Sequence, residues 1–275
     1  MGDMGKMEIK LNATVIQRIE ITPDLIKLRV IPRGWDLPVF TPGQWAMLGM
    51  PGSAARCASA DPEMKDHDTE SIIRRAYSIA SSSKANEYLE FYIGLVRSGA
   101  LTPRLFNLRL GDEMWLSPKF SGMFTLSQVP NKFNAVLIAT GTGVSPYMSM
   151  IRTEAAEGIR HRFAIIHGAR HSCDLGYHSE LTTLSDVSNV LAYLPIISRA
   201  EDEPVPWKGL EGFVQNVWTN GALDKAWGIH PTPEDTHVFL CGNPHMVDDM
   251  IEILGREGFR RHSSKNPGQI HVEQY

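Results

Sequence analysis

The chain has 275 residues, of which 43% are hydrophobic and 21% are charged, and its formal net charge is −4. These values are typical of a globular protein with room for two domains. No apolar stretch is long enough to cross a bilayer, and the N-terminus lacks the apolar core of a signal peptide. We therefore expect a cytoplasmic protein with no membrane insertion and no nucleic-acid partner.

Residues 1–130 are typical of short strands separated by turns. Strands are predicted over 13–21, 25–31, 45–50, 76–80, 89–96 and 113–116, with an exposed loop over 51–70. One helix is predicted over 105–110, with Thr102 as its N-cap, Pro103 at the first helical position and Gly111 at its end. This pattern predicts an N-terminal antiparallel β-barrel or sandwich.

From residue 131 onward, strands and helices alternate. The uninterrupted apolar run 135–139 predicts a strand buried on both faces, and further strands are predicted over 163–167, 191–197 and 237–240. Helices are predicted over 146–157, 175–184 and 244–255. Alternation of this kind predicts an α/β domain with a parallel sheet and right-handed crossovers over residues 131–275.

Cys57, Cys173 and Cys241 are the three cysteines of the chain. They are too few for a disulfide framework or for a four-cysteine iron–sulfur cluster. Any metal redox centre that works with this protein is therefore expected on another chain.

A glycine-rich turn, Gly141-Thr142-Gly143, follows the first strand of the second half and precedes a helix. Glycines at such a turn allow the backbone to approach a pyrophosphate, and the first helical amides favour negative charge. Pro146 stands where the ordinary dinucleotide fingerprint has its third glycine, which indicates a related sheet. A purely structural strand–turn–helix corner is the alternative.

Arginines follow the next two strands, as Arg170 after the second and as Ser198-Arg199 after the third. Arginine binds phosphate with two parallel hydrogen bonds, and an arginine near these strand ends accommodates the 2′-phosphate of NADP. Two solvated surface arginines are the alternative. Their position beside the glycine-rich turn favours NADP.

The segment Arg75-Ala76-Tyr77-Ser78 lies on a predicted strand, where Arg75 and Tyr77 share one face. A cofactor that crosses the strand end meets a guanidinium, an aromatic ring and a hydroxyl. A hairpin strand with a packed tyrosine is the alternative.

Together with Leu101-Thr102-Pro103-Arg104-Leu105, Cys241-Gly242-Asn243-Pro244 and the terminal Val272-Glu273-Gln274-Tyr275, these motifs occur in a fixed order. In this order the chain resembles the ferredoxin/flavodoxin–NADP reductases, in particular the bacterial FAD-containing type, over nearly its whole length. The resemblance implies a β-barrel that binds FAD, an α/β domain that binds NADP(H), and electron transfer to or from a separate ferredoxin or flavodoxin by hydride transfer at flavin N5.

The resemblance also implies roles for individual residues. On the FAD side it implies that Arg75 pairs with the pyrophosphate, that Tyr77 stacks on the isoalloxazine and that Ser78 donates toward N5. The further positions implied to hold FAD are Ala76, Tyr92, Ala100, Leu101 and Thr102. On the NADP side the implied positions are Gly141, Thr142, Gly143, Arg170, Ser198 and Arg199.

The resemblance places Cys241 and Glu273 beside the hydride-transfer site, where they align the reacting atoms and relay a proton. A buried structural cysteine and a solvated acid are the alternatives. Tyr275 is expected to stack on the flavin as a displaceable plant-like lid. The chain has Gly212-Phe213 where many bacterial relatives carry a third arginine for the 2′-phosphate, and its loop over 51–73 is longer than expected.

Two other functions remain open at this point. One is an NADH-dependent reductase that supplies an oxygenase, and the other is a non-catalytic flavin-binding electron-transfer subunit.

Overall fold

The computed structural model describes residues 10–63, 67–68, 71–158 and 160–274. The chain divides into two compact units, Met1–Gly122 and Met123–Tyr275, so the division precedes the expected boundary near residue 130. Phe124 belongs to the second unit because its ring packs edge-on against Phe239, with 5.2 Å between the ring centroids. Among the described residues no helix is long and apolar enough to cross a membrane. The cytoplasmic location stays a prediction.

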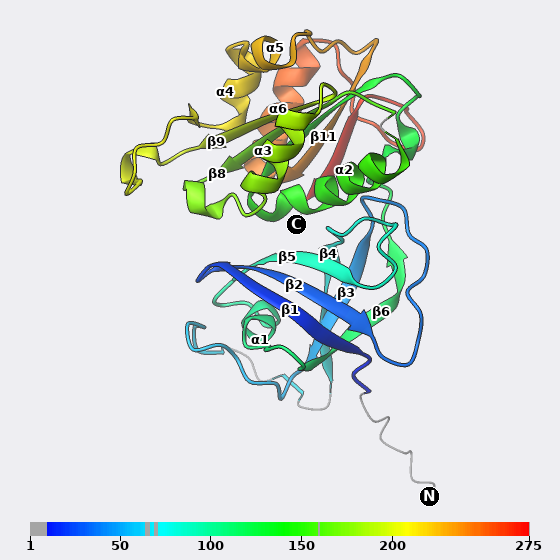
Figure 1. Ribbon diagram of the computed structural model, residues 1–275, viewed down its shortest axis with the longest axis vertical. Helices are drawn as coiled ribbons and strands as arrows, with labels where there is room; N and C mark the ends of the chain where they lie inside the picture. Colours follow the sequence, from blue (N-terminus) through cyan, green and yellow to red (C-terminus); the bar gives the residue numbers. More distant parts are fainter. Residues whose placement is uncertain (1–9, 64–66, 69–70, 159, 275) are drawn as a thin grey trace, which may run out of the picture. The chain divides into compact units, whose positions relative to one another are not determined.

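The first unit is a six-stranded antiparallel sheet with the strand order β4-β3-β6-β1-β2-β5 (Figure 1). Its strands are β1 (Ala13–Thr22), β2 (Leu25–Pro32), β3 (Trp45–Pro51), β4 (Ile72–Ser78), β5 (Leu89–Gly94) and β6 (Glu113–Ser121). The two edges of this order meet just beyond β4, where Ala80 N donates to Glu90 O at 2.8 Å. The sheet therefore closes into the expected antiparallel β-barrel.

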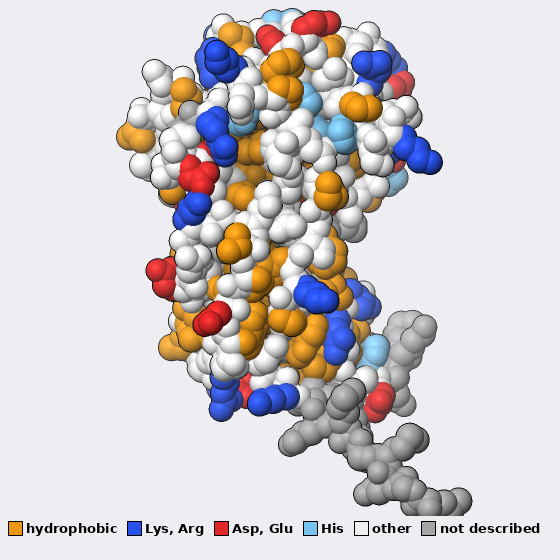
Figure 2. All heavy atoms as spheres, turned by 90° about the vertical axis from the view of Figure 1, so that its right-hand side faces the viewer, with side chains coloured by type: hydrophobic (Ala, Val, Ile, Leu, Met, Phe, Trp, Pro, Cys, Tyr) orange, Lys and Arg blue, Asp and Glu red, His pale blue; other side chains and the backbone are white. Residues whose placement is uncertain are grey.

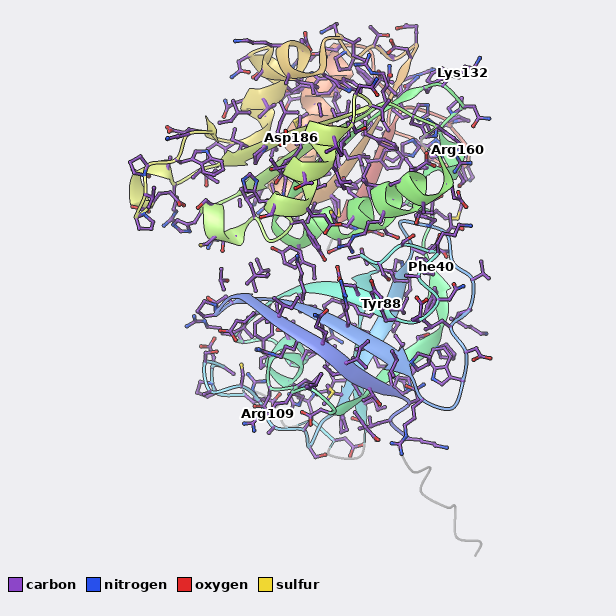
Figure 3. All side chains as sticks on the ribbon, viewed as in Figure 1. Phe40, Tyr88, Arg109, Lys132, Arg160 and Asp186 are labelled. Carbon is purple, nitrogen blue, oxygen red and sulfur yellow. The ribbon has the colours of Figure 1, made fainter. Side chains whose placement is uncertain are left out.

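Alternating side chains of the strands fill the barrel. Ala46, Leu48 and Met50 of β3 are buried in its core together with Leu28 of β2. Phe40 (Figure 3) packs edge-to-face against Phe120, with ring centroids 5.8 Å apart. These apolar positions recur every second residue, which is the period that places side chains on one face of a strand.

One buried acid in the barrel wall is paired. Glu90 is 1% exposed and accepts a hydrogen bond of 2.6 Å from Arg29 Nε. The Arg29 guanidinium also lies 4.6 Å from the ring centre of Tyr88, which Figure 3 labels. Pairing compensates the cost of burying a carboxylate at this position.

The second unit is a six-stranded parallel sheet with the order β10-β9-β8-β7-β11-β12. Its strands are β7 (Asn134–Thr140), β8 (Phe163–Ala169), β9 (Leu191–Ile197), β10 (Leu210–Glu211), β11 (Thr236–Gly242) and β12 (Ile270–Gln274). Its helices are α2 (Ser145–Glu157), α3 (His178–Val187), α4 (Val214–Thr219), α5 (Ala222–Trp227) and α6 (Pro244–Arg256). The predicted α/β fold with a parallel sheet is confirmed.

Both faces of this sheet are covered. The core on one face is formed by β7, β8, β9 and β11 with side chains of α4, α5 and α6, among them Val217, Trp227 and Met250. Helices α2 and α3 lie on the opposite face (Figure 1). The five residues 135–139 in the middle of β7 are 0% exposed, as expected for a central parallel strand.

Candidate cofactor site

The site in the second unit lies at the carboxyl ends of β7 and β11. From β7 the chain proceeds to β8 and β9 on one side, and later returns to place β11 on the other side of β7. This is the point at which the strand order reverses. In open α/β sheets the ligand binds outside the carboxyl ends of the strands at such a point.

Two tight turns interlock at this position. The first is a 3₁₀ turn, Gly141–Val144, which leads directly from β7 into α2, and the second is Gly242-Asn243 at the end of β11. A Cβ on Gly143 would lie 2.4 Å from Cys241 O, and a Cβ on Gly242 would lie 2.3 Å from Thr140 Oγ1. Asn243 N donates to Thr140 Oγ1 at 2.9 Å. Only glycine allows the two backbones to pack this closely, whereas a Cβ on Gly141 would meet nothing within 4 Å.

Tyr147 joins the two strands behind these turns. It is fully buried, and its hydroxyl lies 2.9 Å from Ile138 O and 2.8 Å from Phe239 O, so its one proton is shared between the two carbonyls. Burial raises the pKa of this phenol well above its ordinary value, and electrostatic interaction with Cys241 and Glu273 acts in the same direction. The phenol is therefore a fixed neutral donor. Sequence reasoning missed this residue, although an aromatic directly after Pro146 at a helix start is a signal of packing against the turn.

His167 supports the first turn from β8. It is 0% exposed, and its Nε2 lies 3.0 Å from Gly141 O. Burial lowers the pKa of His167 to about 4, so the ring is neutral at pH 7 and Nε2–H is the donor. In the sequence His167 stands inside the apolar run of a buried strand, a pattern that indicates a buried polar contact. This contact was not identified from the sequence.

Cys241 and Glu273, the two residues expected beside the hydride-transfer site, lie on adjacent strands. They are register partners in the parallel pair of β11 and β12, so their side chains leave the sheet on the same face. Cys241 is buried, and Glu273 is half-buried. Cys241 follows Phe239 by two residues in β11, and the Phe239 carbonyl is an acceptor of the Tyr147 hydroxyl.

The three predicted phosphate-binding residues are also neighbours. The pairing of β8 and β9 continues beyond the strands, because Ser198 N donates to Ala169 O and Arg199 N to Arg170 O, both at 3.0 Å. Both arginine side chains are exposed. An anion at this edge can therefore contact two guanidinium groups and a hydroxyl. Gly212 follows β10, and its N–H donates to Ile197 O at the end of β9. The next residue, Phe213, is 64% exposed.

Five of the predicted FAD-side residues lie on two strands of the first unit: residues 75–78 on β4 and Tyr92 on β5. In β4 Arg75 is exposed, Tyr77 is half-buried against the barrel core and Ser78 is buried. Burial raises the pKa of Tyr77 well above that of a free phenol, so its ring stays neutral. Tyr92 in β5 is 3% exposed.

The segment from Ala100 to Thr102 departs from the expected helix start. The helix α1 spans Thr102–Phe106, so Leu101 holds the N-cap position and the prediction that Thr102 is the cap is wrong. The reason is that Thr102 Oγ1 donates to Val96 O and accepts from Val96 N, each at 3.0 Å. The helix also ends before the predicted residue 110, because Asp112 Oδ2 accepts from Arg109 N at 2.7 Å and closes a turn there.

The residues present fit a bound phosphate group at this segment. Within the described part of the chain, the amides of Ala100 and Leu101 donate to no protein acceptor. Orphan amides are the donors that bind phosphate oxygens in proteins. Tyr275 lies outside the described residues.

The fold and the glycine-rich edge define a nucleotide-binding oxidoreductase, and residues 137–252 match the family model described as "Oxidoreductase NAD-binding domain". A flavodoxin/ferredoxin–NADP reductase of Buchnera aphidicola is 30% identical over 86% of this chain and 88% of its own. A ferredoxin NADP⁺ reductase structure from Neisseria gonorrhoeae, with bound FAD and NADP, superimposes with a TM-score of 0.80 at 25% identity and covers 96% of this chain and 97% of its own. The chain belongs to the flavodoxin/ferredoxin–NADP reductase family.

A second kind of relative is also similar. The reductase component of a phenol 2-monooxygenase from a Pseudomonas strain is 30% identical over 80% of this chain, which spans 55% of that relative.

Proposed function

We propose that this enzyme transfers electrons between NADP(H) and a small carrier, ferredoxin or flavodoxin, with FAD as its resident cofactor. The observation that carries the proposal is the pair of interlocked turns at the carboxyl ends of β7 and β11, with Cys241 and Glu273 in register beside them. When bound, FAD supplies a ring that accepts two electrons as hydride and releases them one at a time.

The chain's own residues bind and orient the two cofactors. In the first unit Arg75 pairs with the FAD phosphates, Tyr77 presents its ring to the flavin, and the Ser78 hydroxyl donates toward flavin N5. Ala76 and Tyr92 line the same cofactor. The exposure of Arg75 and the half-burial of Tyr77 support these roles, since both side chains are accessible to a ligand from β4.

In the second unit the turn Gly141-Thr142-Gly143 binds the pyrophosphate of NADP(H). Arg170, Ser198 and Arg199 hold the 2′-phosphate. Cys241 supports the nicotinamide ring as a buried neighbour, and Glu273 holds a proton beside it. Holding the reacting groups at the correct distance supplies much of the rate enhancement in reactions of this kind.

The carrier docks on the first unit in this proposal. One face of that unit gathers hydrophobic side chains, with Lys and Arg side chains along one margin and a few Asp and Glu side chains at the other (Figure 2). An apolar patch with a basic margin suits brief contact with an acidic protein. The flavin lid assigned to Tyr275 stays a prediction.

A second candidate is an NADH-dependent reductase of an oxygenase. It is favoured by the similarity to the phenol 2-monooxygenase reductase component and by Phe213, which occupies a position where a further arginine was expected.

Purified enzyme loaded with FAD can be mixed with NADPH or NADH, each with ferredoxin, flavodoxin or no carrier. We expect reduction of a carrier with NADPH at a kcat/KM at least about tenfold above that with NADH. A preference for NADH would favour the second candidate. Reduction of neither carrier by either nicotinamide would contradict both.

A further inference from the structure

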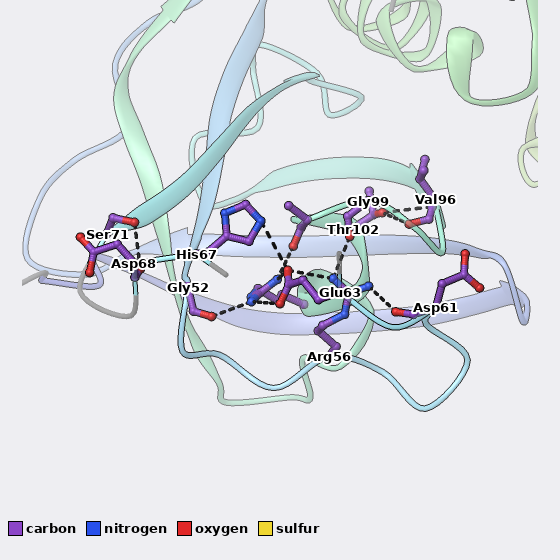
Figure 4. A network of polar contacts seen from close by, with 12 residues as sticks. Gly52, Arg56, Asp61, Glu63, His67, Asp68, Ser71, Val96, Gly99 and Thr102 are labelled. Carbon is purple, nitrogen blue, oxygen red and sulfur yellow. Dashed lines mark hydrogen bonds and ion pairs between the residues drawn. The ribbon is translucent and has the colours of Figure 1, made fainter. Parts of the chain in front are cut away.

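The carboxylate of Glu63 lies at the centre of a polar network in the long loop between β3 and β4 (Figure 4). Arg104 Nη1 and Nη2 donate to its two oxygens at 2.8 and 3.0 Å, and Arg56 Nη1 donates to Oε1 at 3.0 Å. His67 Nε2 lies 3.5 Å from Oε1. The hydrogen bond from Arg104 is the main cause that lowers the pKa of Glu63 to about 2, so the group is a carboxylate at neutral pH.

The same two guanidinium groups also hold backbone carbonyls, three of them in the segment that precedes α1 and one at the start of the loop. Arg104 donates to Ala100 O at 2.6 Å and to Gly52 O at 2.6 Å. Arg56 donates to Gly99 O at 3.0 Å and to Arg97 O at 3.1 Å. The loop and the segment are therefore fastened to each other through the arginines.

The arrangement leaves Arg104 unable to bind a phosphate itself. Its side chain is 3% exposed, and each of its two terminal nitrogens makes two hydrogen bonds, which uses all four terminal N–H groups. Glu63 and the carbonyls of Ala100 and Gly52 are its acceptors. Its Nε is buried as well, so Arg104 can act on a ligand only through the backbone that it holds.

Holding these carbonyls fixes the direction of two amides. In a trans peptide the N–H of a residue points opposite to the C=O of the residue before it. The bonds at Gly99 O and Ala100 O therefore turn the N–H groups of Ala100 and Leu101 away from the guanidinium groups. Within the described residues these two amides donate to no acceptor, and Thr102 fixes the other end of the segment through Val96.

We infer that Glu63, Arg56 and Arg104 are positioning residues for FAD: they orient the amides of Ala100 and Leu101 toward its pyrophosphate. This inference rests on the proposed function, because it needs FAD as the ligand. It gives the unusually long loop a role, since the loop supplies Arg56 and Glu63, two of the three side chains.

The variant Glu63→Gln tests the inference. It keeps the shape of the side chain but removes the charge and one of the acceptor oxygens. Apoenzyme titrated with FAD, with NADPH-driven ferricyanide reduction as the readout, should need about ten times more FAD for half-saturation, since one hydrogen bond to a charged group is worth a factor of that order. The turnover number at saturating FAD should stay within about twofold. Binding of riboflavin, which has no phosphate, should be unchanged.

Glu180→Gln is the matched control. It removes a comparable two-point ion pair, in which Arg152 contacts both oxygens of Glu180 at 2.7 Å in the second unit. Its half-saturating FAD concentration should equal that of the unaltered enzyme.

Arg56→Lys decides the matter if Glu63→Gln does not fold. A single ammonium group cannot replace both Nη1, which donates to Glu63 and Gly99 O, and Nη2, which donates to Asp61 O and Arg97 O. It should show the same selective loss of FAD over riboflavin. Unchanged FAD affinity in the folded variant, or equal losses of FAD and riboflavin, would overturn the inference while leaving the proposed function intact. If the unaltered apoenzyme binds no FAD, the proposed function fails and the inference fails with it.

Discussion

Arg170 and Arg199 follow neighbouring strands, and the bond from Arg199 N to Arg170 O holds their backbones 3.0 Å apart. Arg199 Nη1 lies 3.9 Å from Oδ2 of Asp202, and the side chains of Arg199 and Asp202 are both exposed. A salt bridge of that length on the surface contributes little, so Arg199 remains able to bind an anion. At the scale of single residues, this pair is the basis of the proposed preference for NADP.

Replacing Arg199 tests that preference. In Arg199→Ala we expect the KM for NADPH to rise about tenfold and the KM for NADH to change less than twofold, because a charge-assisted hydrogen bond to the 2′-phosphate is lost. Steady-state kinetics with both nicotinamides measure this. Arg256→Ala, which removes an exposed arginine from the end of α6, is the control. Equal losses with the two nicotinamides would remove Arg199 from phosphate recognition.

At the scale of elements, the two interlocked turns are the least tolerant part of the sheet edge. In Gly143→Ala the added methyl would lie 2.4 Å from Cys241 O, and backbone atoms cannot give way cheaply. We expect this variant to lose at least about 2 kcal/mol of stability, in the range of overpacked sites, and to bind NADP⁺ at least about tenfold more weakly. Thermal unfolding and calorimetric titration measure both effects.

The control is Gly255→Ala in α6, where an added Cβ meets nothing within 4 Å. It should keep its affinity for NADP⁺ and gain up to about 1 kcal/mol of stability, since alanine favours a helix interior. A Gly143→Ala variant as stable as this control would contradict the description of the two turns.

A histidine cluster joins β11 and β12 at the opposite end from the turns. His237 Nδ1 lies 2.8 Å from His271 Nε2, and His262 packs beside His271 with 4.8 Å between ring centroids. Burial, together with the neighbouring histidines, lowers the pKa of His237 to about 4 and the pKa of His271 to about 3. Both rings are therefore neutral in the folded protein at pH 7.

The sign of the resulting pH dependence follows from these pKa values. Between about pH 4 and pH 6.5 the unfolded chain binds protons at these histidines and the folded chain does not, so stability falls as the pH decreases through this range. Each histidine contributes at most about 1.4 kcal/mol per pH unit. Urea unfolding at pH 5 and at pH 7.5 measures the difference.

The double variant His237→Phe/His271→Phe should show a smaller loss of stability between these two pH values. His245→Asn, at an exposed position of α6, should behave as the unaltered protein. An unchanged pH dependence in the double variant would show that these two rings do not cause the acid sensitivity.

At the scale of the whole molecule, the helices and strands that could be predicted are those whose hydrophobic pattern or capping residues match their burial in the fold. The apolar run 135–139 and Pro244 at a helix start identify β7 and α6 because burial and capping leave local signals. β12 (Ile270–Gln274) was not predicted, since only its first two residues are buried and its polar positions resemble a loop. The helices α4 and α5 were not predicted, because each has six residues and the Asn220-Gly221 turn between them interrupts the helical pattern.

The candidate site was predictable to a similar extent. Glycine-rich turns and strand-end arginines leave motifs, and the parallel sheet then brings them together. The contact of Glu63 with Arg104 spans 41 residues, and the support that Tyr147 gives to two strands is likewise a long-range contact. Contacts of this kind depend on how the chain closes on itself, which no local pattern encodes.

The central claim is that this protein is a flavoenzyme reduced by NADPH, and anaerobic titration tests it most directly. The purified protein loaded with FAD is mixed with NADPH under an oxygen-free atmosphere, and the visible flavin absorbance is followed. We predict that the absorbance bleaches with about one NADPH per flavin and returns when oxidised ferredoxin or flavodoxin is added. A flavin band that NADPH leaves unchanged would contradict the account.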